Sequence, residues 1–388
     1  MRDFIYYTFT ILLLTSPIKV FSQVTIGSSV PPAKGALLDL KQNNDGSSNK
    51  GLALPRVELA ANNILTVASG STEEINHIGL VVYNTKTIVT NKEELLCPGV
   101  HVWNGKRWTP AVPYPEYGAA PPSLAGPTAD LIDSRDGESY HTARFHSVKW
   151  VYSCEKGTTY TLVDAGIWMT QNLRYTGSLS NSPADNYVNM QYYTPSNTGA
   201  NTARIRENGK LYNWAAASSQ KGNTTTGDGN ADNPPTYVSN DEGYGKPDAA
   251  TETRRQGICP DGWHLPTHTE WYELKDALIL RPDLYSSQTS ASSSNVGNVM
   301  KSTLSGSGTY QGTSKTADKG GFAGLLTGFA NQNRVTGYAV SGFWWSSSSK
   351  MTVNSYKQRV DNSTTNVDSD GSSRNNLFSV RCKKNNID

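Results

Sequence analysis

A segment rich in proline and alanine, residues 109–127, divides the chain, and this division constrains the fold more than any other feature. Proline has no backbone N–H to donate, so such a segment favours a semi-rigid, extended linker over a helix or a central strand. The chain is 388 residues long, and domains commonly contain about 100–200 residues. We therefore expect a folded part on each side of the linker. Its prolines are Pro110, Pro113, Pro115, Pro121, Pro122 and Pro127.

The first 22 residues have the order of a secretory signal. Arg2 supplies the positive charge, the stretch from Phe4 to Leu14 is mostly apolar, and Ser22 is a small residue suited to cleavage. No later apolar run approaches the roughly 20 residues that a membrane helix needs. We expect a signal peptide over residues 1–22 and an exported mature chain without a transmembrane segment. The cell surface, the medium and the periplasm all stay open as destinations.

The composition favours an extracellular, loop-rich protein. Hydrophobic residues make up 36% of the chain and charged residues 18%, both below the usual fractions, and Ser, Thr, Asn and Gly take their place. With 35 basic and 33 acidic residues the net charge is +2. Because so small a charge creates no global field, nucleic acid and anionic membranes are not expected partners.

Residues 23–108 predict a small β-rich leader module. Short apolar runs at 36–40 and 79–83 are bounded by turn residues, as strands are. Apolar residues alternate around Asn104-Gly105 in the segment from Val100 to Trp108. Asn-Gly is the preferred two-residue hairpin turn, because both central residues need positive φ, so a hairpin is expected here.

Residues 128–388 predict an α+β body with long polar loops. Thr267 and Glu270 form a capping box, and apolar residues at helical spacing follow it, so a helix begins near residue 268. Phe378, Val380 and Cys382 share one face of a final strand. Three segments are too poor in apolar residues to enter the core and are expected as loops: 176–208, 218–252 and 286–319.

Two patterns resemble metal sites, and in both the structural interpretation is favoured. His264 and His268 have the spacing of zinc ligands on a helix, but Pro266 lies between them and the helix begins after Thr267. Asp228, Asn230 and Asp232 alternate like calcium-loop ligands, yet the sequence lacks the expected glycine and the bidentate glutamate. We expect no cofactor, with calcium at residues 228–232 as the alternative to a solvated loop.

The candidate binding residues gather near a tryptophan pair. Adjacent residues of a strand face opposite sides, so one tryptophan could lie in the core while the other lines a surface. Nearby amide, guanidinium and aromatic groups suit sugar hydroxyls and sugar faces. An interpretation in which both tryptophans pack the fold is equally favoured. The candidates are Asn331, Asn333, Arg334, Tyr338, Trp344, Trp345 and Tyr356.

Four cysteines remain in the exported part: Cys97, Cys154, Cys259 and Cys382. An even number in an oxidising compartment favours disulfides, and spacing alone does not choose among the three possible connectivities. No Gly-x-Ser-x-Gly elbow with a placed histidine occurs, and no reactive thiol pair is expected. We therefore do not expect an enzyme.

Several ordered blocks of the second part resemble the Fibrobacter succinogenes major paralogous domain, a family of exported bacterial domains. The blocks are residues 136–140, 167–174, 209–214, 259–267, 342–347 and 378–382. The histidine-containing helix start and the closing strand also look like the C-type-lectin-like fold shared with sulfatase-modifying enzymes. The resemblance implies an α+β, C-type-lectin-like domain over residues 128–388. It also implies a Cys259–Cys382 disulfide, which leaves Cys97 to pair with Cys154.

Residues 24–108 look like the leader modules of Bacteroidetes surface proteins. The similar segments are residues 25–27, 37–40, 51–56, 79–84 and 102–105. Such modules imply display or assembly more than chemistry. Together the two resemblances imply an exported cell-surface or extracellular adhesion protein that recognises a glycan or a protein. The alternative is a structural subunit of a surface filament or matrix with assembly partners, and a secreted enzyme comes third.

Overall fold

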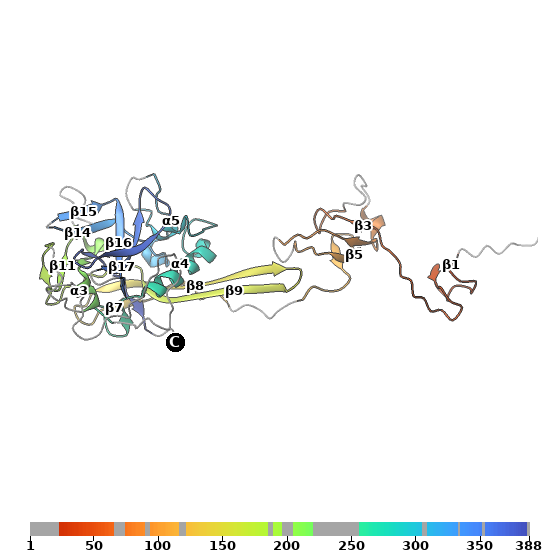
Figure 1. Cartoon of the computed structure of the whole chain (residues 1–388), viewed down its shortest axis with the longest axis horizontal. Coiled ribbons are helices and arrows are strands. Elements are labelled where there is room, and N and C mark those ends of the chain that lie inside the picture. The colour runs from red at the N-terminus through yellow and green to blue at the C-terminus, as the bar shows by residue number, and fades with distance from the viewer. Residues whose placement is uncertain are drawn as a thin grey trace, which may run out of the picture. The chain divides into compact units, whose positions relative to one another are not determined.

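The computed structural model divides the chain into two units, Met1–Tyr114 and Pro115–Asp388. We call them the first and the second unit and describe each by itself (Figure 1). The boundary falls inside the predicted linker, whose first residues belong to the last strand of the first unit and whose last residues begin a strand of the second. The structure describes residues 23–65, 74–89, 94–115, 122–184, 189–195, 205–219, 256–304, 309–332, 334–350 and 354–385.

The first unit contains two small sheets. A four-stranded sheet has the order β3-β4-β5-β6, and β1 and β2 form a separate parallel pair. A hydrophobic cluster in this unit contains the buried residues Leu59, Val82, Leu96, Trp103 and Trp108. The elements are β1 (Val24–Ile26), β2 (Leu38–Leu40), β3 (Arg56–Val57), the 3-10 helix η2 (Glu74–His77), β4 (Val81–Asn84), β5 (Gly99–Trp103) and β6 (Trp108–Pro110).

The predicted hairpin around Asn104-Gly105 is confirmed, but its turn is longer than expected. Trp103 pairs with Trp108, so four residues connect β5 to β6. Gly105 has a φ of +92°, whereas Asn104 keeps a negative φ and its side-chain oxygen accepts hydrogen bonds from the N–H groups of Lys106 and Arg107. Because Asn104 closes the loop through its side chain, the left-handed conformation is needed at the glycine alone.

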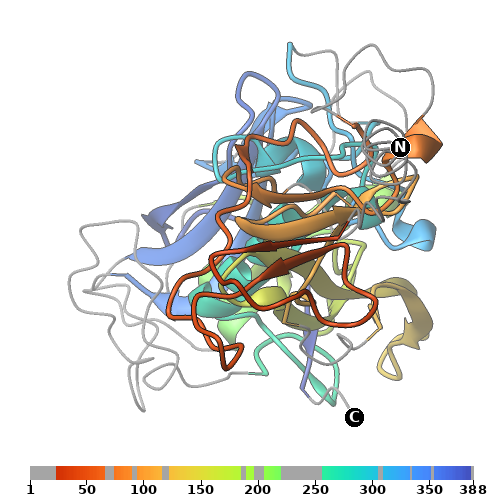
Figure 2. The ribbon, with the colours of Figure 1, turned by 90° about the vertical axis from the view of Figure 1, so that its right-hand side faces the viewer.

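A nine-stranded sheet forms one part of the second unit. Its order is β10-β11-β12-β19-β16-β14-β15, and β17 joins β16 to β18. β16 and β17 lie side by side and appear in blue in both views (Figures 1 and 2). The strands are β10 (Ser180–Asn181), β11 (Gln191–Tyr193), β12 (Leu211–Tyr212), β14 (Thr327–Asn331), β15 (Arg334–Tyr338), β16 (Ser341–Ser349), β17 (Asn354–Asp361), β18 (Asp368–Ser373) and β19 (Phe378–Ser379).

A five-stranded sheet with the order β13-β20-β9-β8-β7 forms the other part. Its two long strands, β8 and β9, make an antiparallel hairpin with one register shift between Phe145 and His146. The short β20 pairs with both β13 and β9. The strands are β7 (Gly126–Ile132), β8 (Ser139–Ser153), β9 (Gly157–Met169), β13 (Trp263–His264) and β20 (Lys383–Lys384).

The helix predicted to begin near residue 268 is confirmed as α4 (His268–Leu280). The Thr267 hydroxyl accepts from the Glu270 N–H at 3.2 Å, and the Glu270 carboxylate accepts from the Thr267 N–H at 2.9 Å. These contacts satisfy two backbone donors that would otherwise be unpaired. The other helices are short: α2 (Ile205–Asn208), α3 (Trp214–Ser218), η4 (Pro282–Leu284), α5 (Val296–Met300) and η5 (Ala317–Lys319).

The expectation of an α+β, C-type-lectin-like domain is wrong, because the second unit is mostly β. Among the described residues α4 is the one helix longer than five residues. Segments that alternate with period two extend into long paired strands, as in β8, β9 and β16. The predicted helix therefore packs against a body of sheets. Within the described ranges, no helix is long and apolar enough to cross a membrane.

Candidate functional site

The two tryptophans of the predicted binding surface are both fully buried, at 0% exposure. They point to opposite sides of β16, as neighbours on a strand do. The Trp344 ring contacts Phe322 at a centroid distance of 5.4 Å, and the Trp345 ring contacts Phe378 at 4.3 Å. Their indole N–H groups donate to Asn172 Oδ1 at 2.9 Å and to the Tyr212 carbonyl at 2.8 Å.

The expectation that one tryptophan lines a surface is therefore wrong. A hydrophobic cluster covers each side of β16 at this position, one containing Trp271 and Trp344 and the other containing Trp214 and Trp345. The structural interpretation, in which both rings pack the fold, is the one the structure supports. Neither indole can stack on a ligand without opening the core.

Tyr356 is also buried, and its ring stacks on His268 with centroids 3.8 Å apart. A second ring, Tyr272, meets His268 edge-on at 5.0 Å. Burial, together with the positive charges of Lys275 and Lys350, lowers the pKa of His268 to about 3. His268 is thus a neutral aromatic group of the core at ordinary pH, and Tyr356 is its packing partner.

The remaining candidates lie on the hairpin of β14 and β15. Asn331 pairs with Arg334 at the end of this hairpin, and Arg334 is exposed. Tyr338 is partly buried, and its hydroxyl accepts from Asn208 Nδ2 at 3.0 Å. Arg334 and Tyr338 share one face of β15, since they are four residues apart on a strand. Asn333 lies outside the described residues.

His264 occupies a polar cluster that is separate from His268. Its Nε2 lies 3.0 and 2.9 Å from the two Glu270 oxygens, and its Nδ1 lies 2.7 Å from Asn385 Oδ1. Lys383 Nζ contacts Glu270 Oε1 at 3.0 Å. Burial alone would raise the pKa of Glu270, but the His264 hydrogen bond and the Lys383 charge outweigh it and lower the pKa to about 2.

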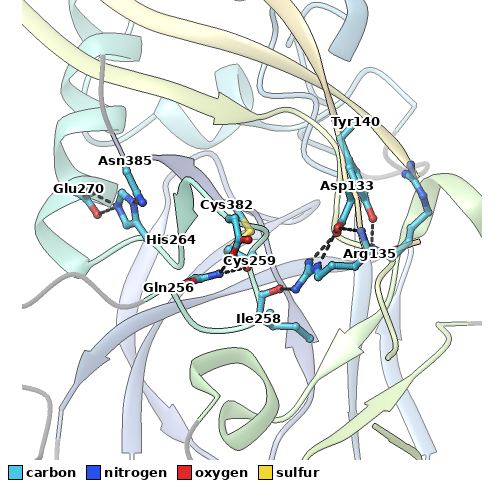
Figure 3. The surroundings of a disulfide bond; sticks show 12 residues. Asp133, Arg135, Tyr140, Gln256, Ile258, Cys259, His264, Glu270, Cys382 and Asn385 are labelled. Atoms are coloured by element: carbon cyan, nitrogen blue, oxygen red, sulfur yellow. Dashed lines mark hydrogen bonds and ion pairs between the residues drawn. A yellow bond between two sulfur atoms is a disulfide. The ribbon is translucent and has the colours of Figure 1, made fainter. Parts of the chain in front are cut away.

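A disulfide lies next to this cluster. Cys259 and Cys382 are bonded, with Cα atoms 5.8 Å apart, which confirms the pairing implied by the family resemblance. Figure 3 shows His264, Glu270 and Asn385 on one side of the bond and Asp133 with Arg135 on the other. Both remaining cysteines, Cys97 and Cys154, are also disulfide-bonded.

The buried Asp133 side chain holds Arg135 in a bidentate ion pair, with N–O distances of 2.8 and 2.7 Å. The same guanidinium donates to the Ile258 carbonyl at 2.9 Å, directly before Cys259. Bidentate ion pairs of this kind fix the orientation of the guanidinium and also stabilise the contact. The groups around the disulfide therefore hold the segment before β13 against the rest of the unit, which is a structural task.

Arg381, next to Cys382, is a buried cation. Its guanidinium donates to Asn172 Oδ1 at 2.9 Å and to the carbonyls of Phe322 and Ala323, and it lies 4.1 Å from the Phe322 ring centroid. Burial lowers its pKa to about 9. Asn172 Oδ1 also accepts a hydrogen bond from the Trp344 indole N–H, so one amide oxygen links Arg381 to Trp344, a candidate binding residue of the sequence analysis.

Neither metal pattern gains support. Within the described part of the chain, no group of three or more His, Cys, Asp or Glu side chains could hold a metal ion. His264 contacts Glu270 in the polar cluster, whereas the His268 ring stacks on Tyr356. The calcium alternative at Asp228, Asn230 and Asp232 lies outside the described residues.

Sequence reasoning missed the polar cluster, although part of its signal was visible. The capping box identified Glu270, but only its backbone role. Its partners Lys383 and Asn385 come from β20 and the residue that follows it, more than a hundred positions away. They reach Glu270 because β13 pairs with β20, placing His264 opposite Lys383.

Comparisons with known proteins found family models that match each part of the chain. The family model described as the Fibrobacter succinogenes major domain matches residues 163–384, which is more than half of the chain. A second model, described as a phage tail like trimerisation region, matches residues 25–125. No curated protein and no solved structure matches the chain. The first match begins in β9 and ends in β20, so it contains the Cys259–Cys382 disulfide, both buried tryptophans, and His264, Glu270 and Lys383 of the polar cluster. The chain belongs to the Fibrobacter succinogenes major domain family.

Proposed function

We propose that this chain is a non-catalytic, self-assembling protein of the cell exterior, in which the first unit joins three copies and the second unit is the domain displayed. The observation that carries the proposal is the match of residues 25–125 to a trimerisation region. The proposal corresponds to the alternative expected from the sequence, a structural subunit of a surface filament or matrix, and adds that three copies assemble. The Cys259–Cys382 disulfide of the second unit and the signal-like first 22 residues support an exported chain.

The exposed face of the β1–β2 pair supports assembly. Val24 pairs with Leu38 and Ile26 with Leu40, so four apolar side chains share one face of a two-stranded parallel sheet. All four are exposed. A two-stranded sheet is marginal in water, and parallel sheets are normally covered on both faces. Contact with other copies would cover this face and stabilise the strands.

Sedimentation equilibrium of the mature chain, beginning at Gln23, tests the proposal. We expect a mass three times that of one chain. The double variant Ile26→Ser/Leu40→Ser removes two of the four apolar side chains of this face and is expected to weaken the trimer. Leu52→Ser is the matched control, because Leu52 is also exposed but lies outside the strands. A single-chain mass for the unmodified protein at all concentrations contradicts the proposal.

Recognition of a glycan or a protein is the second candidate function, and the β14–β15 hairpin is the observation that favours it. Arg334 is exposed beside Asn331, and the Tyr338 ring lies on the same face of β15. Guanidinium, amide and aromatic groups are those that bind sugars. The buried Trp344 and Trp345 take no part in this candidate surface.

A glycan and extracellular-protein array with the mature chain tests recognition, run with calcium and again with chelator. We expect Arg334→Ala and Tyr338→Ala to abolish any signal that depends on the hairpin. Lys106→Ala is the control, since it removes an exposed positive charge from the first unit. Binding that survives both hairpin variants would place recognition elsewhere. Loss of binding with chelator would support the calcium alternative.

A further inference from the structure

The outer part of the β8–β9 hairpin is a two-stranded ribbon. β7 pairs with β8 at residues 139–144, and β20 pairs with β9 at Trp168. From Lys149 to Leu162, the described strands β8 and β9 pair with each other and with no other described strand. Figure 1 shows this part of the hairpin, in yellow, running beyond α4.

One face of the ribbon is apolar and the other is mostly polar. Trp150 lies opposite Tyr160 on the first face, and Leu162 follows on the same side. The two aromatic rings meet edge-on with centroids 6.1 Å apart. On the second face Lys149 lies opposite Thr161. Successive residues of a strand alternate between faces, so the sequence itself builds this amphipathic ribbon.

The apolar face is open to solvent. Trp150 is 39% exposed, Tyr160 42% and Leu162 45%. α4 reaches only the base of the ribbon, where Ser147 Oγ donates to the Ala277 carbonyl and Arg281 donates to the Val148 carbonyl. An isolated two-stranded ribbon is only marginally stable in water. Burying its exposed aromatic side chains against another surface would stabilise it. The ribbon therefore has the character of a contact surface.

The last residues of the region matched to the trimerisation model, which belong to the second unit, contact this ribbon. The Thr158 N–H near its tip donates to the Pro115 carbonyl at 3.4 Å. Gly157 beside it has a φ of +69°, and a Cβ there would lie 1.6 Å from the Pro115 oxygen, so the close approach requires glycine. At the ribbon's base the Ser123 hydroxyl donates to the His146 carbonyl at 3.0 Å. Pro115 and Ser123 both belong to the matched region 25–125.

We propose that the apolar face formed by Trp150, Tyr160 and Leu162 packs against the same face of the two other copies in the trimer. This inference rests on the proposed trimer and adds a second contact, located in the displayed unit. Both ends of the ribbon are hydrogen-bonded to residues 115–125, the last part of the matched region. Three copies joined through the matched region therefore bring three ribbons together. Contact between the three ribbons removes the exposed aromatic face from water.

Pyrene labelling of a new cysteine on the apolar face tests the contact. The mature Leu162→Cys chain is labelled with pyrene maleimide, after peptide mapping has established that its native disulfides are intact. Excimer emission requires two pyrenes in contact, so we expect it for residue 162 in the trimer. Thr161→Cys is the matched control: it is the neighbouring exposed position on the opposite face and is expected to give monomer emission only.

The mass measured on the same samples separates the two proposals. A trimer mass without excimer emission at residue 162, or with equal emission at 161 and 162, overturns the ribbon contact and leaves the trimer standing. A single-chain mass for the unlabelled wild-type protein refutes the trimer and the ribbon contact with it.

Subunit exchange gives a second reading that needs no label on the ribbon. Trimers that carry different fluorophores on their N-terminal amines are mixed, and the rate of exchange is followed by energy transfer. We expect the double variant Trp150→Ser/Tyr160→Ser to exchange at least about tenfold faster than the wild type, equivalent to about 1.4 kcal/mol. Thr159→Ser/Thr161→Ser, on the opposite face, is the control and should exchange at the wild-type rate. Equal rates for the two double variants would contradict the contact.

Discussion

The buried Glu270 carboxylate gives a stability that depends on pH in a calculable way. The pKa of Glu270 in the folded chain is about 2, below its ordinary value of 4.5, because His264 and Lys383 outweigh the cost of burial. Each pKa unit corresponds to about 1.4 kcal/mol, so the lowering of the pKa favours the folded state by about 3 kcal/mol at pH 7. Since the folded pKa is the lower one, this contribution is complete above about pH 4.5 and is lost as the pH falls towards 2.

Glu270→Gln isolates this contribution. Glutamine has nearly the same shape and still accepts the hydrogen bond from the Thr267 N–H, so the helix cap is retained. We expect the free energy of unfolding at pH 7 to fall by about 3 kcal/mol, measured by urea unfolding of the mature chain with tryptophan fluorescence. At pH 3 the same comparison should give less than half that difference, because the carboxylate of the unfolded wild type is then mostly protonated while about nine tenths of the folded one stays ionised.

Glu273→Gln is the matched control on the same helix. Its carboxylate lies 3.4 Å from the same Lys383, but its side chain is 37% exposed. Solvent screening limits such a pair to below about 1 kcal/mol. Equal losses for the two variants, or a Glu270→Gln difference that is the same at pH 7 and pH 3, would refute the reasoning.

Three further predictions concern the core of the second unit. Cys259→Ser/Cys382→Ser should lower the free energy of unfolding by up to about 5 kcal/mol, because the bond closes a loop with a sequence separation of 123. The thermal midpoint of this variant should fall by as much as that of the wild type falls when its disulfides are reduced. Trp345→Ala should cost about 3–5 kcal/mol in urea unfolding, whereas Arg334→Ala should change stability by less than about 0.5 kcal/mol; similar values would contradict the assignment of one residue to the core and the other to the surface. Arg381→Met should cost about 2–4 kcal/mol by leaving buried oxygens without their donor, and an unchanged midpoint would show that these hydrogen bonds add nothing net.

Local patterns in the sequence predicted local structure well. The capping box at Thr267 gave the first turn of α4, and the Asn104-Gly105 pair gave a hairpin at the right place. The family resemblance supplied the Cys259–Cys382 bond, which spacing alone could not choose. The first two signals depend only on residues that are close in the sequence, and the third depends on the ordered sequence blocks shared with the family.

The errors concern what covers a surface. Alternation on β16 predicted that Trp344 and Trp345 face opposite sides, and they do, but it does not tell whether both sides are covered. The covering groups come from distant positions, Trp271 and Phe322 on one side and Phe378 on the other. The lectin-like expectation failed similarly, because one helix start and one closing strand fit many arrangements of sheets.

The position of β19 and β20 within the sheets has a consequence for the timing of folding during the export that we propose. β19 lies between β12 and β16, and β20 lies between β13 and β9, so both sheets are completed by residues 378–384. If the chain is exported as we propose, the second unit cannot close until this segment has crossed the membrane, and Cys259 stays a thiol until Cys382 emerges. Cys97 and Cys154 emerge before either of them. Oxidation in the order of emergence would therefore leave the Cys259–Cys382 bond as the last to form.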